Sequence, residues 1–138
     1  MTQANELEDA ALDEAARTIG QSPVIMVNLI KFRDTPNYVD GFAEAKPDSR
    51  SGYYEGYVGG FYSACEEVGV TPQLVYAGQR IHSLLAGPDD IWDDIVVVRY
   101  ESFADLRAIL DSDVYVRSAK PHRFAVVANW RFIATRAR

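Results

Sequence analysis

The pattern of apolar and polar positions predicts a central strand that continues directly into a helix. Within residues 92–100, the β-branched residues from Ile95 to Val98 alternate between the two faces of a sheet, so both faces are apolar there. Ser102 follows, and its hydroxyl can accept a hydrogen bond from a backbone N–H of the first helical turn. Asp105 favours the positive end of that helix. We therefore expect this strand and helix to organise the fold.

The N-terminal third of the chain predicts a helix followed by another strand. Apolar residues at a spacing of four predict a helix over 5–19, with Asn5 as its N-cap and Gly20 directly after its end. A strand is predicted over 24–32, and both of its faces are apolar except at Asn28. Two interpretations of Asn28 stay open: its amide is satisfied by backbone groups, or it faces a cavity.

A loop is predicted over 34–51, and helical periodicity follows over 52–68. Glycines inside this helix each lower its propensity by up to roughly 1 kcal/mol. We therefore expect a close approach to the sheet, or a local distortion, at Gly56, Gly59 and Gly60. The helix also has more aromatic residues than one buried face needs, which we interpret as core and subunit interface rather than a ligand-stacking surface. These residues are Tyr53, Tyr54, Tyr57, Phe61 and Tyr62.

The next part of the chain predicts a hairpin and a broken helix. A strand over 73–85 is joined to the central strand by a turn at 87–90, so the two strands form a hairpin. The helix that begins at Phe103 is interrupted by an Asp-Ser-Asp segment, which caps a further helical turn over 114–120. Pro121 is expected to end that turn, because proline cannot continue a helix without losing a hydrogen bond.

A last strand over 124–134 completes the order helix, then β-α-β-β-α-β. This order is typical of the ferredoxin-like α+β fold, a four-stranded antiparallel sheet with two helices on one face. We divide the chain into an N-terminal helical extension, 1–22, and a ferredoxin-like domain, 23–138. The second sheet face is apolar as well, and an exposed apolar face of that size is unusual. We therefore expect a homodimer in which two sheets face each other and enclose a barrel-like interior.

Composition and charge indicate one ordinary globular domain and exclude some partners. The 138 residues carry a net charge of −6, whereas binding to nucleic acid or to an anionic membrane requires an excess of cations. No apolar run approaches the roughly 20 residues that span a bilayer, and the acidic N-terminus is unlike a secretory signal. The single cysteine, Cys65, excludes an internal disulfide and is expected to be a buried, unreactive thiol. A cytoplasmic location is therefore expected.

Five short segments carry a recognisable pattern. They are Val-Asn-Leu-Ile-Lys-Phe at 27–32, Val-Tyr-Ala-Gly at 75–78, Trp-Asp-Asp with Val-Arg-Tyr-Glu-Ser within 92–102, Ser-Asp-Val-Tyr at 112–115 and His-Arg at 122–123. Together they resemble a bacterial domain family of unknown function in the dimeric α+β-barrel superfamily, over residues 23–135. Relatives in that superfamily include cofactor-free quinone-forming monooxygenases, haem-degrading monooxygenases, lactone isomerases, peroxidases and ligand-sensing domains. The resemblance therefore implies a fold but does not select one activity.

The resemblance also allows a haem site to be tested in the sequence. Haem-degrading relatives have a similar Ser-Asp-Val-aromatic segment, followed four residues after the aromatic by the histidine that binds iron. Ala119 occupies that position here, and His122 lies three residues further on, past Pro121. We therefore expect no haem. Because His82 and His122 are the two histidines and no cluster has ligand spacing, we also expect no metal site and no other cofactor.

Polar residues on otherwise apolar strand faces are the candidates for a functional site. In this architecture, ligands occupy an apolar cavity between the sheet and the helices, or lie near the mouth of the barrel. His122 and His82 are the candidate catalytic residues, because histidine exchanges protons near neutral pH; the alternative for His122 is a helix-terminal cap. Arg99 could hold a carboxylate or enolate, and its alternative is an ion pair with a nearby acid. The candidate binding residues are Asn28, Tyr76, Arg99 and Trp92.

Three functions of different classes stay open. The first is a cofactor-independent enzyme of monooxygenase, isomerase or cyclase type that acts on an apolar carbonyl-containing compound, with Asn28 or Arg99 as the oxyanion partner. The second is a ligand-sensing module without turnover, and the third is a purely structural dimer. A cavity lined by Asn28, Tyr76 and a histidine would favour the first two, whereas a sealed apolar interior would favour the third.

Overall fold

A single four-stranded antiparallel sheet forms one layer of the molecule. The computed structural model describes residues 5–138, and the order of its sheet is β2-β3-β1-β4. This order, with β1 and β3 at the centre, confirms the predicted ferredoxin-like α+β fold. The strands are β1 (Val24–Phe32), β2 (Gln73–Gln79), β3 (Asp94–Tyr100) and β4 (Val127–Thr135).

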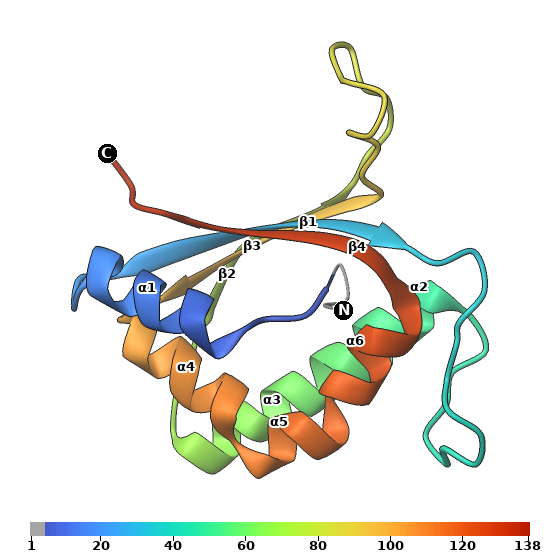
Figure 1. Cartoon of the computed structure of the whole chain (residues 1–138), viewed down its shortest axis with the longest axis horizontal. Coiled ribbons are helices and arrows are strands. Elements are labelled where there is room, and N and C mark those ends of the chain that lie inside the picture. Colours follow the sequence, from blue (N-terminus) through green and yellow to red (C-terminus); the bar gives the residue numbers. More distant parts are fainter. Residues whose placement is uncertain (1–4) are drawn as a thin grey trace.

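The helices form a second layer, which covers one face of the sheet and leaves the other face open (Figure 1). One continuous helical segment connects β1 to β2, and three short helices connect β3 to β4. No helix within residues 5–138 has the length and hydropathy needed to cross a membrane. The helices are α1 (Asp9–Ile19), α2 (Ser49–Ser51), η1 (Gly52–Tyr57), α3 (Val58–Val68), α4 (Phe103–Asp111), α5 (Asp113–Ser118) and α6 (Lys120–Val126).

The two faces of the sheet differ in burial, although both are apolar. On the helix side, alternate residues of β1 are buried, and they are Val24, Met26, Asn28, Ile30 and Phe32. On the open face, an apolar row crosses all four strands. Within this row Tyr76 is 56% exposed and Ile133 is 46% exposed. The row consists of Tyr76, Val97, Val27 and Ile133, from β2 to β4.

The N-terminal helix starts later than predicted, and Asn5 is not its cap. α1 begins at Asp9. The Asn5 side chain is buried instead, and its Nδ2 donates hydrogen bonds to the backbone carbonyls of Arg123 (3.3 Å) and Val127 (2.7 Å). α1 itself packs on the domain, because Leu12 belongs to the same core cluster as residues of α3 to α5.

The connection from β3 to β4 departs from the prediction at Pro121. Both predicted helix caps are present: the hydroxyl of Ser102 accepts from the Asp105 N–H (3.2 Å), and within the Asp-Ser-Asp segment it is Ser112 whose hydroxyl accepts from the Tyr115 N–H (3.1 Å). Pro121, however, does not end the helical turn but lies in the first turn of α6. Proline is tolerated there because the N–H that it lacks would have no partner within the helix. β4 consequently begins three residues later than the predicted strand over 124–134.

Strand β2 is much shorter than the predicted strand over 73–85. It ends at Gln79, and residues 80–93, here called the arm, project from the open side of the sheet (Figure 1). The predicted turn at 87–90 is present within the arm, where the Asp90 N–H donates to the Gly87 carbonyl (3.2 Å). Three aliphatic side chains of the arm are almost completely exposed: Ile81 (96%), Leu84 (92%) and Leu85 (98%).

The glycines of the helix over 52–68 mark both a distortion and a close approach. The distortion is a π-helical segment, η1, in place of the first turns of an α-helix. The close approach is to neighbouring helices, not to the sheet as predicted. A Cβ atom on Gly60 would lie 2.3 Å from the Ser118 carbonyl oxygen, and one on Gly56 would lie 2.3 Å from Nδ1 of His122. Gly59 faces open space, with no atom within 4 Å of such a Cβ.

Candidate functional site

An apolar cavity of about 200 Å³, here called the inner cavity, lies between the sheet and the first helical segment. Residues of η1, α3 and α4 form one wall, and residues from the helix side of the sheet form the other. Its place agrees with the predicted location of a ligand in this architecture. The aromatic excess of residues 52–68, which we interpreted as core and interface, lines this cavity together with rings from the sheet. These rings belong to Tyr53, Tyr54, Tyr57, Phe61, Tyr62, Tyr100, Trp130 and Phe132.

Asn28 is the amide in the wall of the inner cavity, and both interpretations of it hold in part. Its Nδ2 donates to the Val96 carbonyl (3.0 Å), and its Oδ1 accepts from Nε1 of Trp130 (2.9 Å). The side chain is buried, at 8% exposure, and lines the cavity. An amide can make up to four hydrogen bonds. A bound molecule could therefore use the second N–H and the second oxygen lone pair of Asn28.

Tyrosine hydroxyls supply most of the other polar atoms of the cavity wall. Tyr53 and Tyr100 are buried, and neither hydroxyl has a hydrogen-bond partner within residues 5–138. Burial raises the pKa of both tyrosines, so both hydroxyls remain protonated and able to donate at neutral pH. Buried polar groups normally have partners. An acceptor oxygen of a ligand, or water, would therefore satisfy these two groups.

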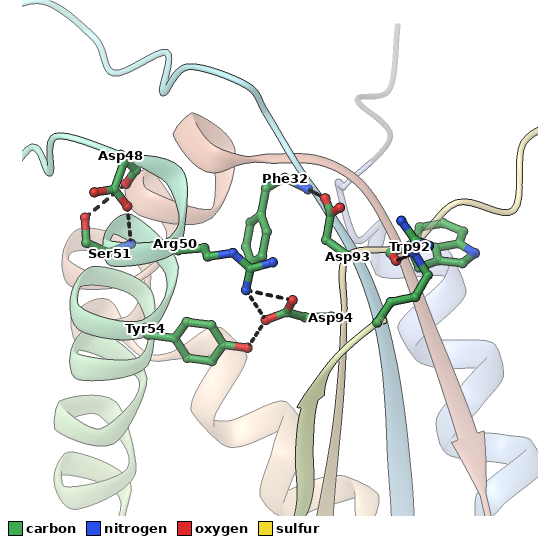
Figure 2. A network of polar contacts seen from close by, with 9 residues as sticks. Phe32, Asp48, Arg50, Ser51, Tyr54, Trp92, Asp93 and Asp94 are labelled. Carbon is green, nitrogen blue, oxygen red and sulfur yellow. Dashed lines mark hydrogen bonds and ion pairs between the residues drawn. The ribbon is translucent and has the colours of Figure 1, made fainter. Parts of the chain in front are cut away.

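Tyr54 also lies in the cavity wall, and its hydroxyl bonds to a carboxylate of the sheet that is ion-paired with an arginine (Figure 2). Its hydroxyl donates to the Asp94 carboxylate, whose oxygens lie 2.8 and 3.0 Å from Nη1 of Arg50. Burial and the hydrogen bond to Asp94 raise the pKa of Tyr54. Asp48 caps the same helical segment by accepting from the Ser51 N–H (2.9 Å). These contacts fix the start of the segment against β3 and leave the Tyr54 hydroxyl occupied.

Tyr57 connects the inner cavity to a buried arginine. Its hydroxyl lies 2.8 Å from the hydroxyl of Tyr115, and Nη1 of Arg123 donates to that Tyr115 oxygen at 2.5 Å. Tyr115 and Arg123 are both buried, at 2% and 3% exposure. Burial raises the pKa of Tyr115 well above its usual range. The chain of hydrogen bonds therefore runs from a guanidinium, through a neutral phenol, to the cavity wall.

His122, a predicted catalytic residue, does not line the inner cavity. It is buried beneath the loop over 33–48, and its Nδ1 lies 2.7 Å from the hydroxyl of Tyr38. The rings of Tyr38 and Phe42 both meet the imidazole edge to face, at 5.4 and 5.3 Å between centroids. Burial lowers the pKa of His122, with a further contribution from Lys46. In this position the imidazole holds the loop against α6.

His122 should make the folded state less stable in mild acid. Because its pKa is lowered in the folded state, the unfolded chain binds the proton more tightly, and stability falls as the pH drops below about 6.5. H122Q, which keeps an acceptor for Tyr38 but cannot be protonated, should show a smaller loss of stability between neutral pH and mild acid. Urea unfolding at several pH values measures this difference. H82Q, in the exposed arm, is the control and should follow the unchanged chain; equal slopes for H122Q would contradict the assignment.

The other predicted site residues lie on the far side of the sheet from the inner cavity. Tyr76 and Arg99 are on the open face, and Arg99 forms an ion pair with Glu101 at 2.6 Å, as its alternative interpretation stated. Trp92 lies at the base of the arm, under the guanidinium of Arg131 (5.2 Å to the ring centroid). His82 is exposed in the arm. Of the predicted set, the structure brings only Asn28 to the inner cavity.

Two features of the inner cavity escaped prediction from the sequence. The first is the contact between Tyr115 and Arg123, because the helix was predicted to end at Pro121, whereas α6 extends through Arg123 to Val126. The second is the aromatic lining of the cavity, although the aromatic excess of residues 52–68 was a usable signal for it. Among residues 5–138, no group of three or more His, Cys, Asp or Glu side chains is placed to hold a metal ion.

Comparisons with known proteins bear on the fold of the chain and do not indicate an activity. No protein-family model matches the chain, and no curated protein matches it. A crystal structure of a protein of unknown function from Rhodopseudomonas palustris is similar, with 22% identity and a TM-score of 0.80, covering 99% of this chain and 98% of that one. The methylated form of the same protein gives 23% identity and a TM-score of 0.83, covering 100% and 97%.

Two further solved structures are similar at lower scores. A dimeric protein of unknown function with a ferredoxin-like fold, from Bacteroides fragilis, has 12% identity and a TM-score of 0.50, covering 83% of this chain and 96% of that one. A DABB family protein with a ferredoxin-like fold, from Mesorhizobium loti, has 10% identity and a TM-score of 0.52, covering 86% and 99%. These likenesses support the ferredoxin-like fold and carry no activity to this chain.

Proposed function

We propose that the chain is a small-molecule-binding protein that holds an aromatic compound with an acceptor oxygen in the inner cavity. The observation that carries this proposal is an apolar cavity that is walled by aromatic rings and lined by two tyrosines whose hydroxyls have no hydrogen-bond partner among residues 5–138. An apolar protein cavity of about 150 Å³ holds one benzene-sized molecule, so about 200 Å³ suits one ring with substituents or two fused rings. The oxygen of such a ligand would accept hydrogen bonds from Tyr53, Tyr100 or the Asn28 amide.

The chemistry of the wall favours binding over proton abstraction. Among the described residues that line the inner cavity, none has a side chain that is ionised at neutral pH. A general base must lie within hydrogen-bond reach of the proton that it removes, and His122 and His82 both lie elsewhere. The phenol donors could still stabilise an oxyanion. A ligand-binding or ligand-sensing role is therefore preferred to that of an acid–base enzyme.

We further propose that the protein works as a homodimer formed through the open face of the sheet. The apolar row of Tyr76, Val97, Val27 and Ile133 crosses all four strands, and a second copy could cover it about a two-fold axis. The arm extends on the same side and exposes Leu84 and Leu85, so it could pack against that copy (Figure 1). The solved Bacteroides fragilis protein of the same fold is dimeric, which agrees with this arrangement.

Filling the inner cavity should abolish ligand binding without unfolding the protein. Ala77 lies in the cavity wall on the edge strand β2, and because it is exposed, a larger side chain there need not displace the core. Isothermal titration with 2-naphthamide, a neutral two-ring probe, should show one site in the unchanged chain and none in A77F. A43F, in the exposed loop over 33–48, is the control and should bind as the unchanged chain does.

Native mass spectrometry of freshly purified protein complements this titration, because it detects a metabolite carried through purification. Release of an aromatic compound from the unchanged chain but not from A77F would support the proposal. If 2-naphthamide does not bind and no compound is carried, the structural-dimer function is favoured instead.

A further inference from the structure

The buried guanidinium of Arg123 forms no ion pair with any of the described residues. It is 3% exposed, and among residues 5–138 every ion pair involves other side chains. Its Nε has no hydrogen-bond partner there. Residues 1–4, Met-Thr-Gln-Ala, contain no carboxylate side chain. A buried charge is costly unless it is paired, so the absence of an acid near this arginine requires an explanation.

Aromatic rings surround the Arg123 guanidinium but do not neutralise it. Its Cζ lies 5.0 Å from the ring centroid of Trp130, 5.1 Å from that of Phe124 and 5.9 Å from that of Tyr115. Such contacts attract a cation through the negative faces of the rings. They hold the guanidinium in place, yet its positive charge is still available to an anion that enters the same region.

The position of Arg123 next to the inner cavity allows such an anion to come from the ligand. Arg123 lines a second, smaller cavity of about 10 Å³, which has room for roughly one water-sized group. Tyr53, Tyr57 and Trp130 line both this small cavity and the inner cavity. One layer of side chains therefore separates the guanidinium from a molecule in the inner cavity.

A chain of hydrogen bonds also connects the Arg123 guanidinium to the cavity wall and polarises the hydroxyl at its end. Arginine can only donate, so the Tyr115 oxygen accepts from Arg123. The Tyr115 hydroxyl can then donate to the oxygen of Tyr57, which leaves the Tyr57 O–H free to donate into the inner cavity. In a low-dielectric interior, successive hydrogen bonds polarise one another. The Tyr57 hydroxyl is thereby a stronger donor toward a negatively charged oxygen than an isolated phenol would be.

We propose that the inner cavity selects anionic aromatic ligands, such as carboxylates or enolates, with Arg123 as the counter-charge and Tyr57 as the donor to the anionic oxygen. This inference rests on the proposed function and adds the charge of the ligand to it. Tyr115 is a positioning residue, since it acts through Tyr57. The role that the sequence suggested for Arg99 is thus given to a different arginine, one that lies on the helix side of the sheet.

A matched pair of probes tests the selection for charge. 2-Naphthoate and 2-naphthamide have the same ring system, and only the first is anionic at neutral pH. The unchanged chain should bind 2-naphthoate at least about tenfold more tightly, because hydrogen bonds to a charged group are the stronger kind. R123M should lose this preference, and Y57F and Y115F should reduce it while 2-naphthamide affinity changes little. Y38F, whose lost hydroxyl bonds to His122 and not to the cavity, is the control and should keep the preference.

The outcomes separate this inference from the proposed function. If the unchanged chain binds both probes equally, and R123M does the same, the inference is wrong while the binding function stands. If neither probe binds the unchanged chain, the proposed function itself fails. Should R123M not fold, Y57F and Y115F decide, because replacing a buried tyrosine by phenylalanine keeps the shape of the core. An undiminished preference for 2-naphthoate in both of those variants overturns the role of the hydrogen-bond chain.

Discussion

G60A should destabilise the folded protein by about 3 kcal/mol, whereas G59A, one residue earlier, should stabilise it slightly. A Cβ atom on Gly60 would lie 2.3 Å from the carbonyl oxygen of Ser118 and 2.6 Å from the backbone nitrogen of Ala119. Both atoms belong to the main chain, so no side-chain rotation relieves the clash, and α3 would have to move away from α5. Chemical denaturation of the two variants and the unchanged chain measures the shifts.

Gly59 provides a matched control for the substitution at Gly60. It lies in the same helix, but a Cβ atom there would meet nothing within 4 Å. Alanine favours a helix over glycine by up to about 1 kcal/mol, so G59A should raise the free energy of unfolding while G60A lowers it. Equal stabilisation by both substitutions would mean that the helices do not approach each other at Gly60.

V97D should convert the proposed homodimer into a monomer or cause it to aggregate. Val97 is at the centre of the apolar row on the open face, paired with Val27 on one side and Tyr76 on the other. In a two-fold dimer each copy would bury an unpaired carboxylate in this row. Because an unpaired buried charge costs several kcal/mol, the dissociation constant should rise by at least about a hundredfold. Light scattering or analytical ultracentrifugation at micromolar concentration measures the change.

A charge of the same kind outside the open face provides the control. Val39 is 73% exposed in the loop over 33–48, and V39D should leave the dimer intact. A monomeric unchanged chain at micromolar concentration would remove the basis for the proposed interface. An intact, soluble V97D dimer would place the interface on another surface.

The fold could largely be predicted because its strongest signals are local. Strand β1 has the predicted bounds, the cap at Ser102 is as predicted, and the second cap lies within the predicted Asp-Ser-Asp segment. The errors occurred where a local signal has two structural meanings. Pro121 ends a helix in one context and begins a helix in another. The alternating pattern of residues 80–85 is compatible with a strand, yet these residues leave the sheet as the arm.

The candidate site was harder to predict, because it depends on which faces of distant elements meet. Asn28 was found by a rule that needs one strand, namely that a polar side chain on an apolar face requires partners. Arg123 needs a longer argument: its environment combines α5, α6 and β4 with a tyrosine from η1. The helical turn that brings Arg123 within reach of Tyr115 continues past Pro121, where the helix was predicted to end. A chain that leaves the helix at Pro121 gives no reason to pair them.

The two tryptophans occupy the two sides of the sheet, and this gives the protein a separate optical reporter for each proposed event. Trp130 lies in the wall of the inner cavity, bonded to Asn28 and beside the guanidinium of Arg123. Trp92 lies at the base of the arm, next to Arg131 of the open face. In W92F, the remaining indole emission would follow occupancy of the cavity. In W130F, the indole emission of Trp92 would follow subunit association. Ligand binding and dimerisation can therefore be titrated independently with these two variants.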